Sequence, residues 1–224
     1  MNLAYLDLFN HVELNEHIVN ILVIENKNLF REMIQQFMQA SLGLDSKWVL
    51  SDKGRVVSLN KVSTIINEPF NIDLNERKLL DGLYNEMVSI AMNEVHYMET
   101  NQMRNCILTC INNIIQDIDY PFVESEDVSL MNLFKLSGVH FENYEGGILE
   151  RISSYAYLCS RFKKFKLLSF VNLKTYFSDE ELVEFYKDME YKKISIILFE
   201  NREYSPLANE KITIIDNDLC VVKC

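Results

Sequence analysis

The chain has 224 residues, of which 48% are hydrophobic and 25% charged, and its formal net charge is −11. This composition excludes wholesale disorder, and no apolar run approaches the roughly 18 residues of a membrane span, so we expect no membrane partner. So negative a charge also argues against indiscriminate nucleic-acid binding. The opening MNLAYLDLFNHVEL lacks the basic region of a signal peptide, and the cysteines form no CxxC pair, which favours a cytoplasmic protein with reduced thiols.

The first seventy residues predict strands with one helix. HIVNILVIE, from His17 to Glu25, is rich in β-branched residues and predicts a strand. Apolar residues at helical spacing predict a helix from Asn28 to Gln39. Asp52-Lys53-Gly54 predicts the turn of a hairpin between KWVL and RVVSL, and VSTII predicts a further strand.

The middle of the chain changes to a helical period. Asp73 followed by Glu76 predicts a capping box, and an apolar seam follows it. The seam is interrupted by polar residues, so we expect the helix to break near Met98 to Gln102 and to double back as a helical hairpin. A further helix is expected from Asp127 to Leu136, with Gly138 at its C′ position.

The last third alternates strands and helices. VHFEN, KLLSFVNL and ISIILFE predict strands, Ile148 to Phe162 predicts a helix, and Ser178 with Glu181 predicts a capping box opening another helix. Short apolar strands alternating with helices predict an α/β fold with a mostly parallel sheet flanked by helices. We therefore expect an α/β head of residues 1–70 and 139–224, with an inserted helical subdomain of residues 71–138.

The sequence contains no recognisable catalytic motif. A phosphate-binding loop needs glycines and a lysine, but the chain after Glu25 reads NKNLF, and neither GxxxxGK[ST] nor GxGxxG occurs. GxSxG and HExxH are also absent. Glu200, at the end of a predicted strand, stands where α/β proteins usually place active sites, yet no partner motif accompanies it. We expect a protein that is not an enzyme.

Two segments concentrate basic residues without any acid, namely residues 53–61 and 151–175. Such segments either contact DNA phosphates or form a solvated cluster that complements helix C-termini, and the charge pattern by itself favours the second interpretation. The candidate DNA-binding residues are Lys53, Arg55, Lys61, Arg151, Arg161, Lys163, Lys164 and Lys166.

Carboxylates gather between Asp117 and Asp127. Clustered hard oxygen donors suit Ca²⁺ or Mg²⁺, although the spacing is not that of an EF-hand, because Phe122 stands where its glycine would be. The alternative is a set of acids that flank a helix N-terminus.

Several stretches, in this order, resemble one family, the type II-A CRISPR adaptation accessory protein. They are ILVIENKNLFREMIQQF, NLFKLSGVHFE, RFKKFKLLSFVNLKTYFSDEELVEFY and ISIILFENRE. The resemblance implies a head like a P-loop ATPase that has lost the nucleotide motif, with the helical insert as its leg. It also implies a homotetrameric ring that takes the ends of double-stranded DNA and serves spacer acquisition beside the CRISPR spacer integrase and the type II effector nuclease.

The resemblance also implies site residues. Calcium ions would stabilise the ring through acids near the leg, for which the candidates are Asp119, Glu124, Glu126 and Asp127. The family's basic run corresponds to Arg161, Lys163 and Lys164. The alternative function is a degenerate nucleotide-dependent ATPase or nuclease, against which the missing glycine loop argues.

Overall fold

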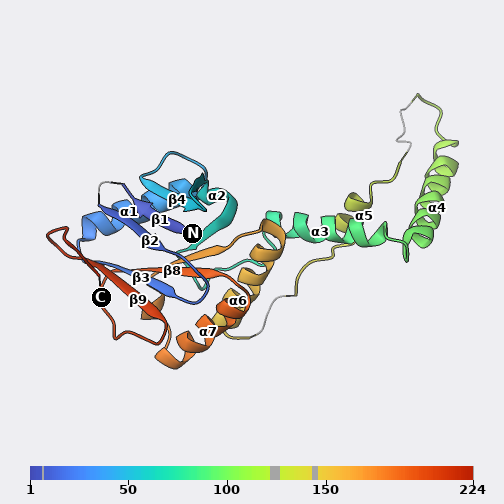
Figure 1. Ribbon diagram of the computed structural model, residues 1–224. Helices are drawn as coiled ribbons and strands as arrows, with labels where there is room; N and C mark the ends of the chain where they lie inside the picture. The colour runs from blue at the N-terminus through green and yellow to red at the C-terminus, as the bar shows by residue number, and fades with distance from the viewer. Residues whose placement is uncertain (7, 122–126, 143–145, 224) are drawn as a thin grey trace. The chain divides into compact units, whose positions relative to one another are not determined.

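The computed structural model describes residues 1–224 except 7, 122–126, 143–145 and 224 (Figure 1). The chain divides into two compact units, one of residues 1–74 and 144–224 and one of residues 75–143. From the sequence we expected the helical subdomain to span residues 71–138. We call the first unit the head and the second the helical unit. In the part of the chain that is described, no helix is both long and apolar enough to cross a membrane.

The head is built on a six-stranded sheet, in the order β10-β9-β3-β8-β7-β6. All neighbouring pairs are parallel except β10 with β9. The strands are β3 (Val19–Ile24), β6 (Ser63–Ile66), β7 (Leu167–Val171), β8 (Ser195–Glu200), β9 (Glu210–Ile215) and β10 (Val221–Lys223). Every residue of β3 and β8 is buried, as strands covered on both faces require.

The two faces of this sheet carry different layers. On one face, Phe199 and Phe37 pack edge-to-face against Trp48, with ring centroids 5.5 and 5.4 Å away. Phe37 belongs to α1 (Lys27–Ser41), whose other buried residues, Met33 and Ala40, share its face. Trp48 begins β4 of a second, antiparallel sheet, and its indole N–H donates to the carbonyl of Met33 (2.9 Å). The second sheet has the order β2-β1-β4-β5, with β1 (Asn2–Tyr5), β2 (Phe9–Glu13), β4 (Trp48–Asp52) and β5 (Arg55–Val57).

The opposite face is covered by α6 (Ile148–Leu158) and α7 (Asp179–Tyr191), which lie together in Figure 1. Phe170 of β7 packs edge-to-face on Phe185 of α7 at 5.7 Å. A π-helical turn (Cys159–Lys163) extends α6 toward β7, and a 3-10 turn (Leu173–Thr175) follows β7. α7 begins with the expected capping box of Ser178 and Glu181.

The expected α/β fold, with a mostly parallel sheet flanked by helices, is confirmed. The first parallel strand, β3, lies inside the sheet and leads through residues 25 and 26 directly into α1. The head therefore has a strand–loop–helix unit at its first parallel strand, with no glycine in the loop. The Lys53-Gly54 hairpin is also confirmed, with both residues at positive φ between β4 and β5.

The helical unit departs from the sequence-based expectation in three places. α3 (Arg77–Ala91) starts after Glu76, which makes no side-chain capping bond, so the capping box of Asp73 is wrong. The break falls at residues 92–96, before α4 (Tyr97–Ile115), and α3 packs against α5 (Leu130–Leu136). The Asn93 side chain causes the earlier break by accepting from the N–H groups of Val95 and His96.

The third departure is the predicted strand VHFEN, whose described residues form no strand. The Asn75 side chain occupies both backbone groups of Phe141, donating to its carbonyl at 3.1 Å and accepting from its N–H at 2.8 Å. The Tyr84 hydroxyl donates to the carbonyl of Val139 (2.8 Å). These bonds replace a strand neighbour and place residues 139–142 in the helical unit, past the expected boundary at 138.

Candidate nucleic-acid interface

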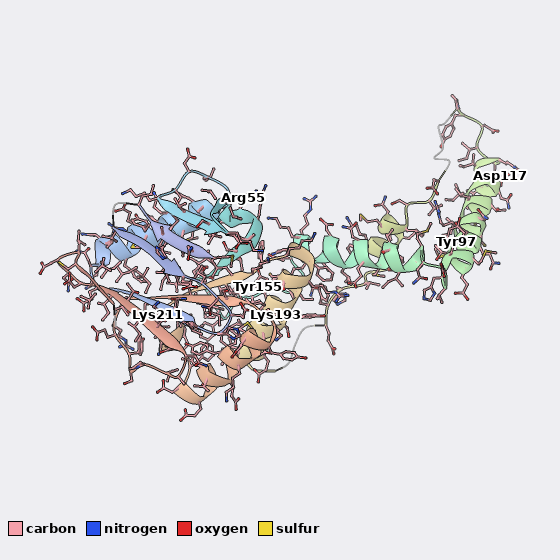
Figure 2. The ribbon with its side chains drawn as sticks, in the orientation of Figure 1. Arg55, Tyr97, Asp117, Tyr155, Lys193 and Lys211 are labelled. Carbon is pink, nitrogen blue, oxygen red and sulfur yellow. The ribbon has the colours of Figure 1, made fainter. Side chains whose placement is uncertain are left out.

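Lysines precede three neighbouring parallel strands of the head. Lys61 lies in the last turn of α2 (Leu59–Val62), just before β6, and Lys166 directly precedes β7. Lys193, labelled in Figure 2, lies two residues before β8. The Lys166 N–H donates to the carbonyl of Val62 and its carbonyl accepts from Ser195, both at 2.8 Å. Adjacent strands lie about 4.8 Å apart, so the three lysines lie close together along one edge of the sheet, the edge formed by the amino ends of the strands. Lys164 lies in the turn that leads into β7, two residues before Lys166. We call Lys61, Lys164, Lys166 and Lys193 the basic edge.

All four lysines of the basic edge are exposed. Over the residues for which side chains are described, no carboxylate pairs with any of them. Nearby Lys192 differs, because Asp188 and Ser153 bind its ammonium. The basic edge therefore offers positive charge that the fold leaves available to an anion.

The remaining members of the basic run contact aromatic side chains. The Lys163 ammonium lies over the rings of Tyr155 and Phe165, at 5.4 Å from each centroid, and is half-buried. Arg161 is exposed and donates to the Tyr157 hydroxyl (3.3 Å). Both lie in the π-helical turn, a feature often found at functional sites.

Three other candidates stand elsewhere. Lys53 and Arg55 are exposed on the β4–β5 hairpin, which belongs to the second sheet. Arg151 lies in the first turn of α6, roughly 15 Å along the helix from Arg161. Lys174, counted among the basic residues of segment 151–175, is buried (6% exposed) and bonded to Glu210. Proximity in sequence therefore overstated how many of these cations share a surface.

Sequence reasoning missed Lys193. It follows the acidic helix α7, so a search for segments with basic residues and no acid does not find it. A search for lysines that directly precede each predicted parallel strand would have found it.

The candidate calcium ligands are described only in part. Asp119 is exposed, whereas Glu124 and Glu126 lie outside the described residues. Asp127 is ion-paired with Arg104. Within the described ranges no group of three His, Cys, Asp or Glu side chains could hold a metal ion. Carboxylates suit calcium as a donor set, but a cation would have to displace Arg104 from Asp127.

The position of a phosphate-binding loop, between β3 and α1, is filled by the protein itself. The Asn26 side chain accepts from the N–H groups of Asn28 and Leu29, both at 3.1 Å. The neighbouring Glu25 carboxylate accepts from the side chain of Asn217 at 3.2 Å. Two of the N–H donors with which a helix N-terminus binds phosphate are thus taken, and a carboxylate beside them would repel a phosphate.

The strand-end Glu200 belongs to a buried network. Lys174 donates from its backbone to Glu200 Oε1 (3.1 Å) and from its ammonium to both oxygens of Glu210 (2.8 Å each). The Tyr186 hydroxyl also donates to Glu210 (2.9 Å). Burial raises the pKa of Glu200 to about 7, against the opposing effect of the Lys174 N–H.

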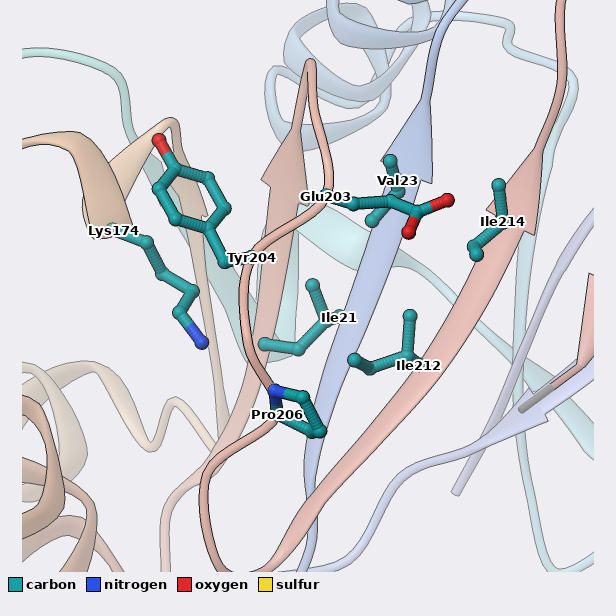
Figure 3. Close-up of a pocket in the computed structure, with 8 residues that line it drawn as sticks. All are labelled: Ile21, Val23, Lys174, Glu203, Tyr204, Pro206, Ile212 and Ile214. Carbon is teal, nitrogen blue, oxygen red and sulfur yellow. The ribbon is translucent and has the colours of Figure 1, made fainter. Parts of the chain in front are cut away.

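A cavity of about 200 Å³ lies beside this network (Figure 3). The loop between β8 and β9, carrying Glu203, Tyr204 and Pro206, crosses the isoleucine-rich face of β3 and β9. The lining is mainly apolar, and Lys174 reaches it with its charge already bound by Glu210. Lys174 also donates to the carbonyl of Ser205, so the network holds this loop against the sheet.

A model of the CRISPR-associated protein family Cas_Csn2 matches residues 42–219. The chain belongs to the Csn2 family. It is 19% identical over 208 residues to the CRISPR-associated protein Csn2 of Streptococcus agalactiae, a match that covers 90% of this chain and 89% of that protein.

A solved structure agrees with the fold. The crystal structure of Stu0660 of Streptococcus thermophilus superposes with a TM-score of 0.60 at 14% identity, covering 96% of this chain and 75% of that one. A putative ABC transporter ATP-binding protein from Pyrococcus furiosus matches over 95% of this chain and 94% of its own length, at 10% identity. Its TM-score is 0.42.

The Csn2 family match confirms the resemblance seen in the sequence and makes this a CRISPR-associated protein. The matched residues 42–219 include every lysine of the basic edge and the whole helical unit.

Proposed function

We propose that this Csn2-family chain is a non-catalytic accessory protein of CRISPR spacer acquisition that binds the ends of double-stranded DNA without reading their sequence. The observation that carries the proposal is the basic edge. Its four exposed lysines, without carboxylate partners among the described residues, occur in a chain whose net charge is −11. Such a distribution directs a polyanion to one surface and repels it from the rest.

The chemistry of the basic edge suits phosphate contacts. Lysine ammonium groups bind phosphate oxygens as point charges and carry no information about the base. The interface has no helix aligned for the major groove, since Lys164, Lys166 and Lys193 come from turns and strand starts. Binding should therefore depend on salt and tolerate any sequence.

Assembly is the second part of the proposal. We infer a homotetrameric ring, held partly by Ca²⁺ at the acidic segment that contains Asp119, Glu124, Glu126 and Asp127. The helical unit supports self-association because it exposes large apolar side chains, among them Val95 (77% exposed) and Leu136 (84%). The partners would be DNA ends, other copies of the chain, the spacer integrase and the type II effector nuclease, in the cytoplasm.

The alternative function is a degenerate ATPase or nuclease. Glu200 at a strand end, with its raised pKa, is the observation in its favour. The Asn26 cap over the N-terminus of α1 and the missing glycine loop are against it. A titration with ATP and Mg²⁺ separates the two, because only the alternative predicts saturable nucleotide binding.

The decisive experiment compares a linear duplex with a covalently closed circle of the same sequence. A ring loads by threading over an end, so the linear form should bind and the circle should not. The logarithm of the binding constant should fall with that of the salt concentration, each neutralised phosphate adding about −0.9 to the slope. Equal affinity for circle and linear duplex would contradict end loading, and absence of duplex binding at low salt would contradict the function.

A further inference from the structure

Two helix-to-strand turns at the basic edge hold lysine where the backbone favours glycine. Lys164 follows the π-helical turn and leads into β7, and Lys193 follows α7 and leads into β8; each has a φ of 58°. This left-handed conformation brings Cβ close to the following carbonyl, so residues other than glycine, asparagine and aspartate are uncommon there.

The hydrogen bonds of these turns require no lysine side chain. At the end of α7 the Lys193 N–H donates to Glu190 and the Ile194 N–H to Met189, at 2.9 and 3.0 Å, as in a Schellman motif. At the other turn the N–H groups of Lys164 and Phe165 both donate to the carbonyl of Cys159. Glycine would make all of these bonds with less strain, so what lysine adds at each turn is its side chain and charge.

The two turns are neighbours. β7 and β8 pair in parallel with Leu167 opposite Ser195, so the turns preceding them lie side by side at the same edge of the sheet. α6 and α7 also pack together, and the Ser153 hydroxyl is bonded to Asp188. Both lysines are exposed, and in the described structure neither has a carboxylate partner. The two turns precede strands that lie about 4.8 Å apart, so long side chains from both turns can reach the same or successive phosphates.

We propose that Lys164 and Lys193 form a paired phosphate contact on the DNA backbone, kept in left-handed turns at a cost to the stability of the head. This inference rests on the proposed function and extends it, because Lys193 lies outside the basic run implied by the family resemblance. The competing explanation is that each lysine only complements the C-terminal dipole of its helix.

Glycine substitution separates the two explanations. Lys164→Gly, Lys193→Gly and the double variant are compared with wild type in thermal melting and in binding to a linear 30-base-pair duplex across a salt series. Relief of strain should leave the melting temperature unchanged or higher. Affinity at low salt should fall at least tenfold in the double variant, and the magnitude of the salt slope should drop by about 1.8, since each lysine contributes about 0.9.

Matched controls complete the design. Lys187→Ala removes an exposed lysine of α7, and Asn209→Gly relieves a left-handed turn (φ 69°) that carries no charge; neither should alter duplex binding. Lys164→Arg with Lys193→Arg should retain it. If wild type binds the duplex and the double glycine variant binds it with the same affinity and salt slope, this inference alone is overturned. Failure of wild type to bind any duplex would overturn the proposed function with it.

Discussion

Glu200 shows how one buried carboxyl couples the head to pH. The residue is fully buried at the end of β8, and Oε2 has no partner among the described atoms. Removing a carboxylate from water disfavours its charged form, so burial raises the pKa of Glu200 from the ordinary 4.5 to about 7. The folded head thus binds this proton more tightly than the unfolded chain does.

Glu200→Gln should flatten the pH dependence of stability. In wild type, the tighter binding of the Glu200 proton by the folded head stabilises the fold. This stabilisation is fully present below pH 4.5 and is lost as pH rises through about 7, a change of at most about 3 kcal/mol in the free energy of unfolding. Urea denaturation at pH 5 and pH 8 measures it. The glutamine variant should lose less stability between these pH values than wild type. Glu203→Gln, at an exposed position, is the control, and equal losses in wild type and Glu200→Gln would contradict the assignment.

Lys174 and Glu210 make a buried ion pair whose side chains are 2% and 0% exposed. Lys174→Met should therefore lower the free energy of unfolding by about 3–5 kcal/mol, because it leaves the Glu210 charge buried without a cation. Lys174→Met combined with Glu210→Gln should cost less than the sum of the two single changes. Lys187→Met is the exposed control. A loss below about 1 kcal/mol in Lys174→Met would contradict a stabilising role for the buried ion pair.

Helix α7 illustrates the scale of a secondary-structure element. The Ser178 hydroxyl accepts from the N–H of Glu181, whose carboxylate accepts in return from the N–H of Ser178. Ser178→Ala removes the first of these bonds, and we expect a loss of about 1 kcal/mol in the free energy of unfolding. Ser58→Ala, at the N-cap of α2 where no side-chain capping bond forms, should cost less. Equal losses in chemical denaturation would show that the capping box is not stabilising.

Elements also decide which cations are available. The π-helical turn after α6 carries Lys163 onto two aromatic rings, while the left-handed residue that follows it leaves Lys164 exposed. Adjacent lysines therefore differ in availability because of local backbone geometry. A charge count over the segment cannot separate them.

At the scale of the whole molecule, the helical unit buries little for its size. Its buried side chains include Leu79, Tyr84 and Leu130, whereas Met98 and Ile114 are 67% and 61% exposed. Assembly would cover such side chains, with the hydrophobic effect as the driving force.

Calcium removal should weaken that assembly. Without a cation, the carboxylates of residues 117–127 would repel one another at the proposed site. Native mass measured with Ca²⁺ should correspond to a tetramer and should fall when EGTA is added. The combined change of Glu124, Glu126 and Asp127 to Ala should reproduce the effect of EGTA, whereas Asp45→Ala in the head should not. If EGTA does not change the mass, the acidic segment does not hold the ring together through Ca²⁺ and is only surface charge.

Local signals in the sequence were sufficient for much of the head. The continuous apolar runs of β3, β7 and β8, the hairpin at Lys53-Gly54 and the capping box of α7 were predictable, because each depends on residues adjacent along the chain. The parallel sheet followed from the alternation of these elements. The same local reasoning misplaced the start of α3 and wrongly predicted a strand at VHFEN. There the side chain of Asn75, which is distant in sequence, forms hydrogen bonds with the backbone N–H and carbonyl of Phe141.

The candidate site was decided by tertiary structure. Lys61, Lys166 and Lys193 come from separate segments and meet because β6, β7 and β8 are neighbours that run parallel, so their amino ends share one edge. Lys174, in the same basic segment as Lys166, is instead drawn into the interior by Glu210. Composition and periodicity determine which elements form, but the order of strands and the burial of each charge depend on contacts between distant residues, which no local pattern encodes.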